Sequence, residues 1–111
     1  MRATPARSAS IDTMKIATWN VNSLKVRLPH LLDWLAGEQP DVVCLQELKC
    51  EDKAFPLAEI EAAGYYAVFN GQKTYNGVVI LSRLAPAAVV RDIPGFDDPQ
   101  KRIIAASIGE I

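Results

Sequence analysis

A leucine-rich helical pattern between two apolar stretches is the feature that most constrains how this chain folds. The stretches at residues 15–22 (KIATWNVN) and 41–47 (DVVCLQE) are rich in residues that favour β-strands. Residues 28–36, between them, carry leucines at the spacing i, i+3, i+4 and i+7, which predicts an amphipathic helix. Gly37 is the expected end of this helix, and Pro40 prevents its continuation. The order strand, helix, strand predicts two parallel neighbouring strands joined by a crossover.

The rest of the chain changes from helical to strand patterns. A short helix is predicted over residues 55–64, with Pro56 in its first turn and Gly64 just past its end. Further strands are expected at 65–70, 76–82, 87–93 and 101–108, with loops over 71–77 and 94–100 and a turn at 109–110. This order predicts an α/β fold, a mixed sheet with flanking helices.

Composition narrows the class of protein. The chain has 111 residues, of which 50% are hydrophobic, so it fits one small domain or part of a larger one. Its net charge of −1 provides no overall basic field, so an anionic partner must be gripped by a local cluster or through a metal. No apolar run is long enough for a membrane span, and we predict no membrane partner.

The amino terminus and the two cysteines bear on the expected location of the protein. Residues 1–13 are small and polar and lack the apolar core of a secretory signal, so we expect a disordered extension, with Met14 as an alternative start. Cys44 and Cys50 form no metal-binding pattern and are predicted to be reduced thiols. A cytoplasmic location, of the bacterial type, is the expectation.

Polar side chains end both of the first two predicted strands. Asn20 lies on one side of the first strand, and Asn22 joins it if the chain stays extended. Glu47 ends the second strand on the side of Val43 and Leu45. Because parallel strands end at the same edge of a sheet, and ligands bind at that edge, the two asparagines and Glu47 are expected to converge.

One carboxylate with neutral amides is a reasonable partial site for Mg²⁺, which keeps several waters. Lys49 is expected on the same side as Glu47, where it can pair with that carboxylate or with an anionic substrate. The alternative is a solvated strand end with a surface Glu-x-Lys pair. Spacing alone leaves both readings open.

Three segments together resemble a known family. MKIATWNVNSLKVR (14–27), PDVVCLQELKCED (40–52) and YNGVVILSR (75–83) are similar in order and spacing to the exodeoxyribonuclease III and abasic-site endonuclease family, within the endonuclease/exonuclease/phosphatase superfamily. The first two motifs are shared across the superfamily, whereas Lys49, residues 75–83 and KRIIAASI (101–108) favour the DNA-repair branch. The resemblance implies that residues 14–111 are the amino-terminal part of a DNase I-like domain, about half of a four-layer α/β sandwich.

The resemblance also implies roles for matching residues. Asn20, Glu47 and Lys49 match catalytic positions, and Glu47, Asn20 and Asn22 match positions around the metal, Mg²⁺ or Mn²⁺. Lys25 and Arg27 match positions that contact the DNA backbone, and Tyr75 matches a tyrosine on a loop that approaches DNA. The alternatives are that Lys25 and Arg27 solvate the start of the helix and that Tyr75 is an ordinary loop aromatic.

The implied activity is that of a DNA repair nuclease. It would hydrolyse phosphodiesters of double-stranded DNA at 3′ ends and at abasic sites, as a monomer when full length. Further catalytic groups of the family follow beyond residue 111, so we expect this chain alone to be poorly active and to aggregate. The alternatives are a superfamily phosphatase acting on lipid or inositol phosphates and a non-catalytic DNA-binding remnant.

Other polar and aromatic residues receive no functional role. His30, the single histidine, lies within the helical pattern and matches no catalytic motif. Trp19 and Trp34 are predicted to be packing residues, and the pair Asp97 and Asp98 is interpreted as part of a solvated loop.

Overall fold

The computed structural model describes residues 14–71, 75–91, 101 and 104–109. The strands are β1 (Ile16–Asn20), β2 (Val42–Gln46), β3 (Tyr66–Asn70), β4 (Val78–Ser82), β5 (Ala87–Val90) and β6 (Ala105–Ser107). The helices are α1 (Leu24–Glu38), α2 (Leu57–Ala62) and a 3₁₀ turn, η2 (Asp52–Ala54). None of the described helices is long and apolar enough to cross a membrane.

A four-stranded sheet in the order β1-β2-β4-β3 forms the centre of the molecule. β1 and β2 are parallel, with Ile16 beside Val42 and Asn20 beside Gln46, while β4 pairs antiparallel with β2 and with β3. The prediction of a mixed sheet, and of a helical crossover between two parallel strands, is therefore confirmed.

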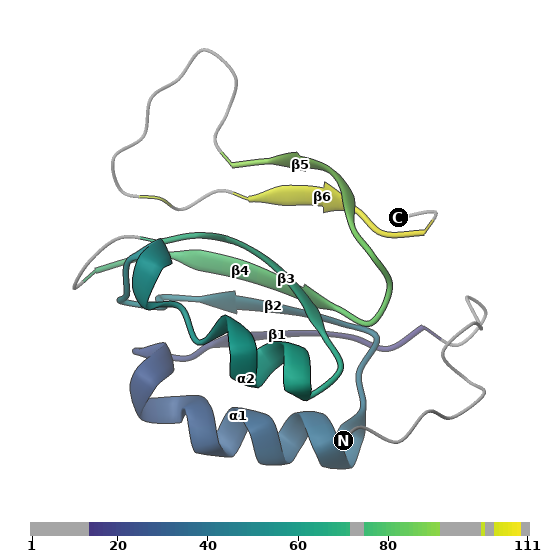
Figure 1. Ribbon diagram of the computed structural model, residues 1–111, viewed down its shortest axis with the longest axis horizontal. Coiled ribbons are helices and arrows are strands. Elements are labelled where there is room, and N and C mark those ends of the chain that lie inside the picture. The colour runs from purple at the N-terminus through teal and green to yellow at the C-terminus, as the bar shows by residue number, and fades with distance from the viewer. Residues whose placement is uncertain (1–13, 72–74, 92–100, 102–103, 110–111) are drawn as a thin grey trace.

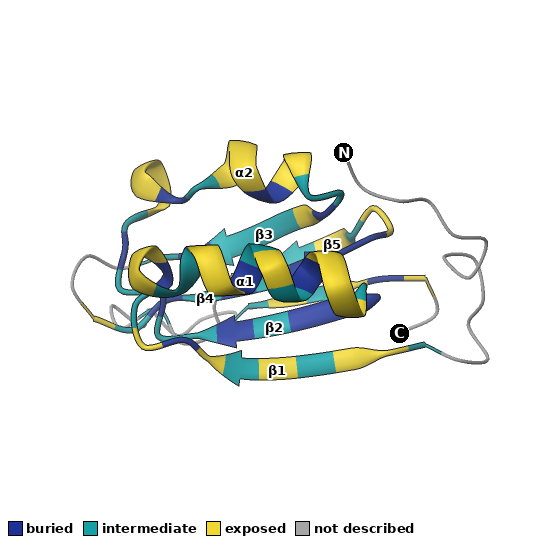
Figure 2. Cartoon of the chain, turned by 90° about the horizontal axis from the view of Figure 1, so that it is seen from below, coloured by how far each residue is buried: buried dark blue, intermediate teal, exposed yellow. Residues whose placement is uncertain are grey.

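The sheet separates two unlike layers. Figure 1 shows α1 and α2 on one side of it and the β5–β6 ribbon on the other. The core lies on the helix side, where leucines of α1 and Ile60 of α2 pack against Val43, Leu45 and Leu81 of the sheet. In Figure 2, which looks onto the helix side, β2 is mostly buried, while β1 at the sheet edge alternates between exposed and intermediate residues.

The bounds of α1 differ from the prediction at both ends. The helix begins four residues earlier, at Leu24, because the backbone N–H of Leu24 is bound by the carbonyl of Leu48 (2.8 Å). Pro29 lies inside α1 and not in its first turn, where proline is best tolerated, so its position in the sequence favoured a later helix start. Gly37 as the helix end was wrong: the left-handed residue that closes α1 is Gln39 (φ 49°), whose N–H donates to the carbonyl of Leu35 (3.0 Å).

The remaining strands lie within their predicted ranges but are shorter. β6 covers three residues of the predicted 101–108, and Lys101, the first residue of that range, is not in a strand. Gly109 has a positive φ of 60° and lies in the predicted turn. The predicted extension at 1–13, the loop at 94–100 with Asp97 and Asp98, and Glu110 lie outside the described residues.

Candidate active site

The ends of β1 and β2 stay joined after both strands have stopped. The backbone N–H of Val21 donates to the carbonyl of Gln46 (3.0 Å), which continues the ladder. The N–H groups of Ser23 and Leu24 then donate to the carbonyls of Glu47 (2.9 Å) and Leu48 (2.8 Å). The first residues of α1 are therefore fastened to the loop that carries Glu47.

A third segment packs against the other edge of that loop. The N–H of Leu48 donates to the carbonyl of Gly77 (3.2 Å), and the N–H of Lys49 donates to the carbonyl of Asn76 (2.8 Å). Tyr75 comes directly before Asn76 and is 65% exposed. Tyr75 is thus adjacent in sequence to a residue that is hydrogen-bonded to the Glu47 loop, and it is open to solvent.

Glu47 reaches the site by a different route from the one predicted. Asn20 pairs with Gln46 in the parallel register, so simple alternation would put the Glu47 side chain on the opposite face, with the buried Val43 and Leu45. However, β2 ends at Gln46, and Glu47 adopts a left-handed conformation (φ 56°). This change in backbone direction, and not a shared strand face, brings the carboxylate to Asn20. The prediction that Glu47 continues the side of Val43 and Leu45 was wrong.

Four predicted side chains form one hydrogen-bonded chain. Nδ2 of Asn20 donates to Oε2 of Glu47 (2.7 Å), and Oδ1 of Asn20 accepts from the backbone N–H of Asn22 (3.1 Å). Nζ of Lys49 donates to Oδ1 of Asn22. Asn22 is left-handed (φ 48°), so the chain does not stay extended there, which was the condition for Asn22 to join Asn20; it meets the others nonetheless. Lys49, also left-handed (φ 57°), pairs with the amide of Asn22.

This donor set suits a hard cation that keeps much of its water. Within the described residues, no group of three or more histidine, cysteine, aspartate or glutamate side chains is placed to hold a metal. Glu47 supplies one carboxylate, with one oxygen engaged by Asn20. Both asparagine oxygens already accept a hydrogen bond, which leaves each with one lone pair. Mg²⁺ binds proteins through one or two carboxylates plus waters, so the residues fit that ion.

A hollow of about 250 Å³ opens beside the Glu47 carboxylate. Its lining residues are Gln46, Glu47, Asn76, Gly77 and Val78. Gln46 was not among the predicted site residues, although its Nε2 donates to Oγ1 of Thr18 (2.8 Å) and to the carbonyl of Cys44 (3.1 Å). The sequence did contain a signal for Gln46. It directly precedes Glu47, and its partner Thr18 lies two residues before Asn20, on the same side of the first strand.

The two predicted DNA-contacting cations lie on the first turn of α1. Lys25 is exposed and Arg27 is half-buried. The hydrogen-bonded chain from Glu47 to Lys49 does not include either of them. Lys25 is close enough to Cys50 for its ammonium to lower the thiol's pKa, although burial, the larger effect, raises that pKa above its usual value. Both cations therefore lie beside the candidate site and outside its hydrogen-bonded centre.

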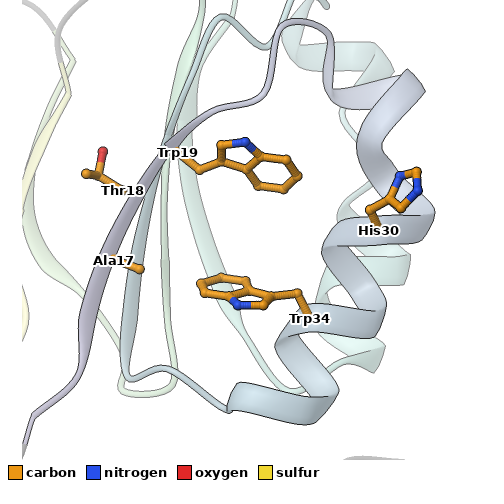
Figure 3. Close-up of a pocket in the computed structure, with 5 residues that line it drawn as sticks. All are labelled: Ala17, Thr18, Trp19, His30 and Trp34. Carbon is orange, nitrogen blue, oxygen red and sulfur yellow. The ribbon is translucent and has the colours of Figure 1, made fainter.

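A larger hollow, of about 350 Å³, lies on the other side of β1. Figure 3 shows Trp19 of β1 and Trp34 of α1 pointing into the space between strand and helix, while Thr18 points to the opposite side of the strand. Both tryptophans pack against the core, as predicted. Since the lining is mainly apolar and on the helix side, this hollow is separate from the Asn20–Glu47 pair.

Comparisons with known proteins identify the family and agree with the fold. The model of the Endonuclease/Exonuclease/phosphatase family matches residues 17–110. Exodeoxyribonuclease III from Haemophilus influenzae is 41% identical over 97 residues, which cover 86% of this chain and 36% of that protein.

Solved structures give the same picture. A 3′ phosphatase, NExo, from Neisseria, bound to a product DNA hairpin, superposes with a TM-score of 0.84 at 52% identity, covering 86% of this chain and 38% of that one. An AP endonuclease from Archaeoglobus fulgidus superposes with a TM-score of 0.82 at 40% identity, covering 88% of this chain and 38% of that one. The chain therefore spans well under half the length of the proteins it matches.

Proposed function

Because the chain belongs to the endonuclease/exonuclease/phosphatase family, we propose that it carries the metal- and phosphate-binding part of an exodeoxyribonuclease III-type DNA repair nuclease. The observation that supports this most directly is the hydrogen bond between Asn20 and Glu47 at the carboxyl edge of two parallel strands (2.7 Å). Ligands bind at this edge in open α/β sheets.

In the proposed site Glu47 holds Mg²⁺ or Mn²⁺ directly. Asn20 orients the Glu47 carboxylate through its Nδ2, and Asn22 and Lys49 form the outer part of the cluster. A bound divalent ion would neutralise the charge that develops on a phosphodiester and favour ionisation of a water. Lys49, with its ammonium held on the amide of Asn22, leaves the Glu47 carboxylate available to the metal.

The proposed substrate is double-stranded DNA with 3′ ends or abasic sites. Lys25 and Arg27, on the first turn of α1, would contact the phosphate backbone, and the exposed Tyr75 would contact the bases or sugars nearby. The names of the similar proteins support this: one structure holds a product DNA hairpin, and another is an AP endonuclease.

We propose further that the full reaction needs groups beyond this cluster. The hydrogen-bonded chain contains one carboxylate and no histidine, and the ammonium of Lys49 is held on Asn22, so the chain has no second carboxylate or imidazole to align water or protonate a leaving group. The chain also spans 36% of the curated relative from Haemophilus influenzae. The chain alone is therefore expected to bind metal and DNA but to cleave DNA poorly.

The metal site is tested by titrating the chain with Mn²⁺ in a calorimeter. Glu47→Gln keeps the shape of the side chain but removes its charge, and we expect it to weaken Mn²⁺ binding by at least about tenfold. The matched control is Glu61→Gln, an exposed carboxylate on α2, which should bind Mn²⁺ as the wild type does. A wild-type chain that binds no Mn²⁺, or a Glu47→Gln variant that binds it unchanged, would contradict the proposal.

The substrate is tested by binding and cleavage. We expect the chain to bind an abasic duplex more tightly than an inositol phosphate, and Lys25→Ala to weaken that binding and lower its salt dependence by about one counterion. A preference for the inositol phosphate would favour the phosphatase alternative. Retained DNA affinity without any Mn²⁺ binding would favour a non-catalytic remnant, and efficient Mg²⁺-dependent cleavage by this chain would contradict its proposed low activity.

A further inference from the structure

Ser23, between β1 and α1, has the least usual backbone conformation of the candidate site. Its φ is 92° and its ψ is 104°, outside the regions that a residue with a side chain readily adopts. Glycine is the residue that tolerates such angles, but this chain places serine there. The Ser23 side chain makes no capping hydrogen bond to α1, so the conformation is not explained by the hydroxyl.

The backbone of Ser23 makes two hydrogen bonds in this conformation. Its N–H donates to the carbonyl of Glu47 (2.9 Å), and its carbonyl accepts from the N–H of Arg27 (3.2 Å) in α1. The next residue, Leu24, donates to Leu48 (2.8 Å). Ser23 is thus the point at which the start of α1 is joined to the Glu47 loop.

Left-handed residues gather around this joint. Of the non-glycine residues with positive φ in the described parts of the chain, those in the three site segments are Asn22, Ser23, Glu47, Lys49 and Asn76. Glu47 needs its left-handed conformation to turn its carboxylate toward Asn20, as the register shows. Strain that clusters at one site in this way requires surrounding bonds to hold it.

We propose that Ser23 is a positioning residue for Glu47. Its backbone N–H binds the Glu47 carbonyl and keeps that residue left-handed, which holds the carboxylate on Asn20 and in the metal site. The inference rests on the proposed function for its consequence in metal binding, but the Asn20–Glu47 hydrogen bond itself can be measured without metal.

The test compares Ser23→Val with Ala88→Val. Ala88 also has a positive φ (52°), is exposed, and lies on β5, outside the site segments, so valine there adds backbone strain without touching Glu47. Two quantities are measured below the melting temperature: the NMR shift of the Asn20 side-chain amide without metal, and Mn²⁺ affinity. Both variants should lower the melting temperature, but only Ser23→Val should move the Asn20 amide toward its free position and weaken Mn²⁺ about tenfold or more.

Two milder variants keep the test decisive if Ser23→Val does not fold. Ser23→Ala should leave the Asn20 amide and the Mn²⁺ affinity unchanged, because the hydroxyl makes no capping hydrogen bond to α1; a loss would overturn a role for the backbone. Ser23→Gly should raise the melting temperature by about 4 °C or more while keeping the Asn20 amide in place, and a lower melting temperature would overturn the strain on which the inference depends.

The outcomes separate the two proposals. An unchanged Asn20 amide in Ser23→Val, or an equal change in Ala88→Val, would overturn the positioning role. If the wild-type chain binds no Mn²⁺ but Ser23→Val still shifts the Asn20 amide, the positioning role is supported and the metal site is contradicted.

Discussion

The two faces of the four-stranded sheet differ in how completely they are covered. On the helix side, Val43, Leu45, Val79 and Leu81 are at most 1% exposed and form one core with α1 and α2. On the other side, Ile16 and Tyr66 are 55% and 51% exposed, and Cys44 and Ile80 are only half-buried. The β5–β6 ribbon lies over that second face and is tied to β3 by the hydrogen bond from Nε of Arg91 to the carbonyl of Phe69 (2.9 Å).

This difference separates what holds the fold from what carries the chemistry. Burial of apolar surface supplies the stability, and it is concentrated on the helix side. The polar groups Thr18, Asn20 and Gln46 are on the less completely covered face, which we call the open side. Glu47 belongs to the open side only because its left-handed backbone interrupts the alternation of β2.

The largest expected effect comes from one pair of neighbours on β4. Leu81 faces the helices and is fully buried, whereas Ile80 faces the open side. Leu81→Ala should lower the free energy of unfolding by about 2–5 kcal/mol through lost burial and a cavity. Ile80→Ala should lower it by about 1–2 kcal/mol, because part of its surface already contacts water. Urea unfolding of the two variants measures the difference.

The prediction is contradicted if Leu81→Ala and Ile80→Ala lower the free energy of unfolding by equal amounts. An equal loss would mean that the open side is as well packed as the helix side, and the separation of stability from chemistry would not hold. As a control, the dependence of the free energy of unfolding on urea concentration should match that of the wild type in both variants, which shows that the folded and unfolded states are unchanged.

A smaller effect is expected from adding charge at the open edge. Asn22→Asp places a second carboxylate beside Lys49 and next to the Asn20–Glu47 pair. It should raise Mn²⁺ affinity by about tenfold, since Mg²⁺-type sites are tuned by ligand charge, and change stability by no more than about 0.5 kcal/mol. Asn22→Ala, which loses the Lys49 contact and adds no charge, is the control. Unchanged affinity in Asn22→Asp would show that Lys49 neutralises the new carboxylate before the metal does.

The meeting of Asn20 and Glu47 at the carboxyl edge of β1 and β2 could be predicted from the sequence, but the backbone conformation of Glu47 could not. Apolar runs around a leucine pattern are enough to predict parallel β1 and β2, and parallel strands end together. The meeting of Asn20 with Glu47 follows from that topology. The left-handed backbone that turns Glu47 toward Asn20 does not follow from the topology, because nothing in the sequence LQELK indicates positive φ at Glu47 and Lys49.

Helix bounds show the same limit. The start of α1 at Leu24 depends on bonds to the carbonyls of Glu47 and Leu48, more than 20 residues away, and local pattern contains no such information. Its end passes Gly37, since glycine is needed only where φ is positive, and that position is Gln39. Gln46 escaped notice because its partner, Thr18, is on a different strand. Contacts distant in sequence thus decided the start of α1 and the role of Gln46, whereas the end of α1 was decided by the local left-handed conformation of Gln39.

The smallest expected effect concerns the two thiols, one on the open side and one in the core. Burial raises the pKa of Cys44 and, with a further contribution from Asp52, that of Cys50. Both should therefore react with iodoacetamide more slowly than free cysteine at pH 8, and the half-buried Cys44 should react before the buried Cys50. The same raised pKa values imply stability that is full below about pH 8.5 and falls as the pH rises, since the unfolded thiols ionise first. Mass spectrometry of timed alkylation gives the order; if Cys50 reacts first, the core side opens more readily than the open side, and the contrast between the two faces is reversed.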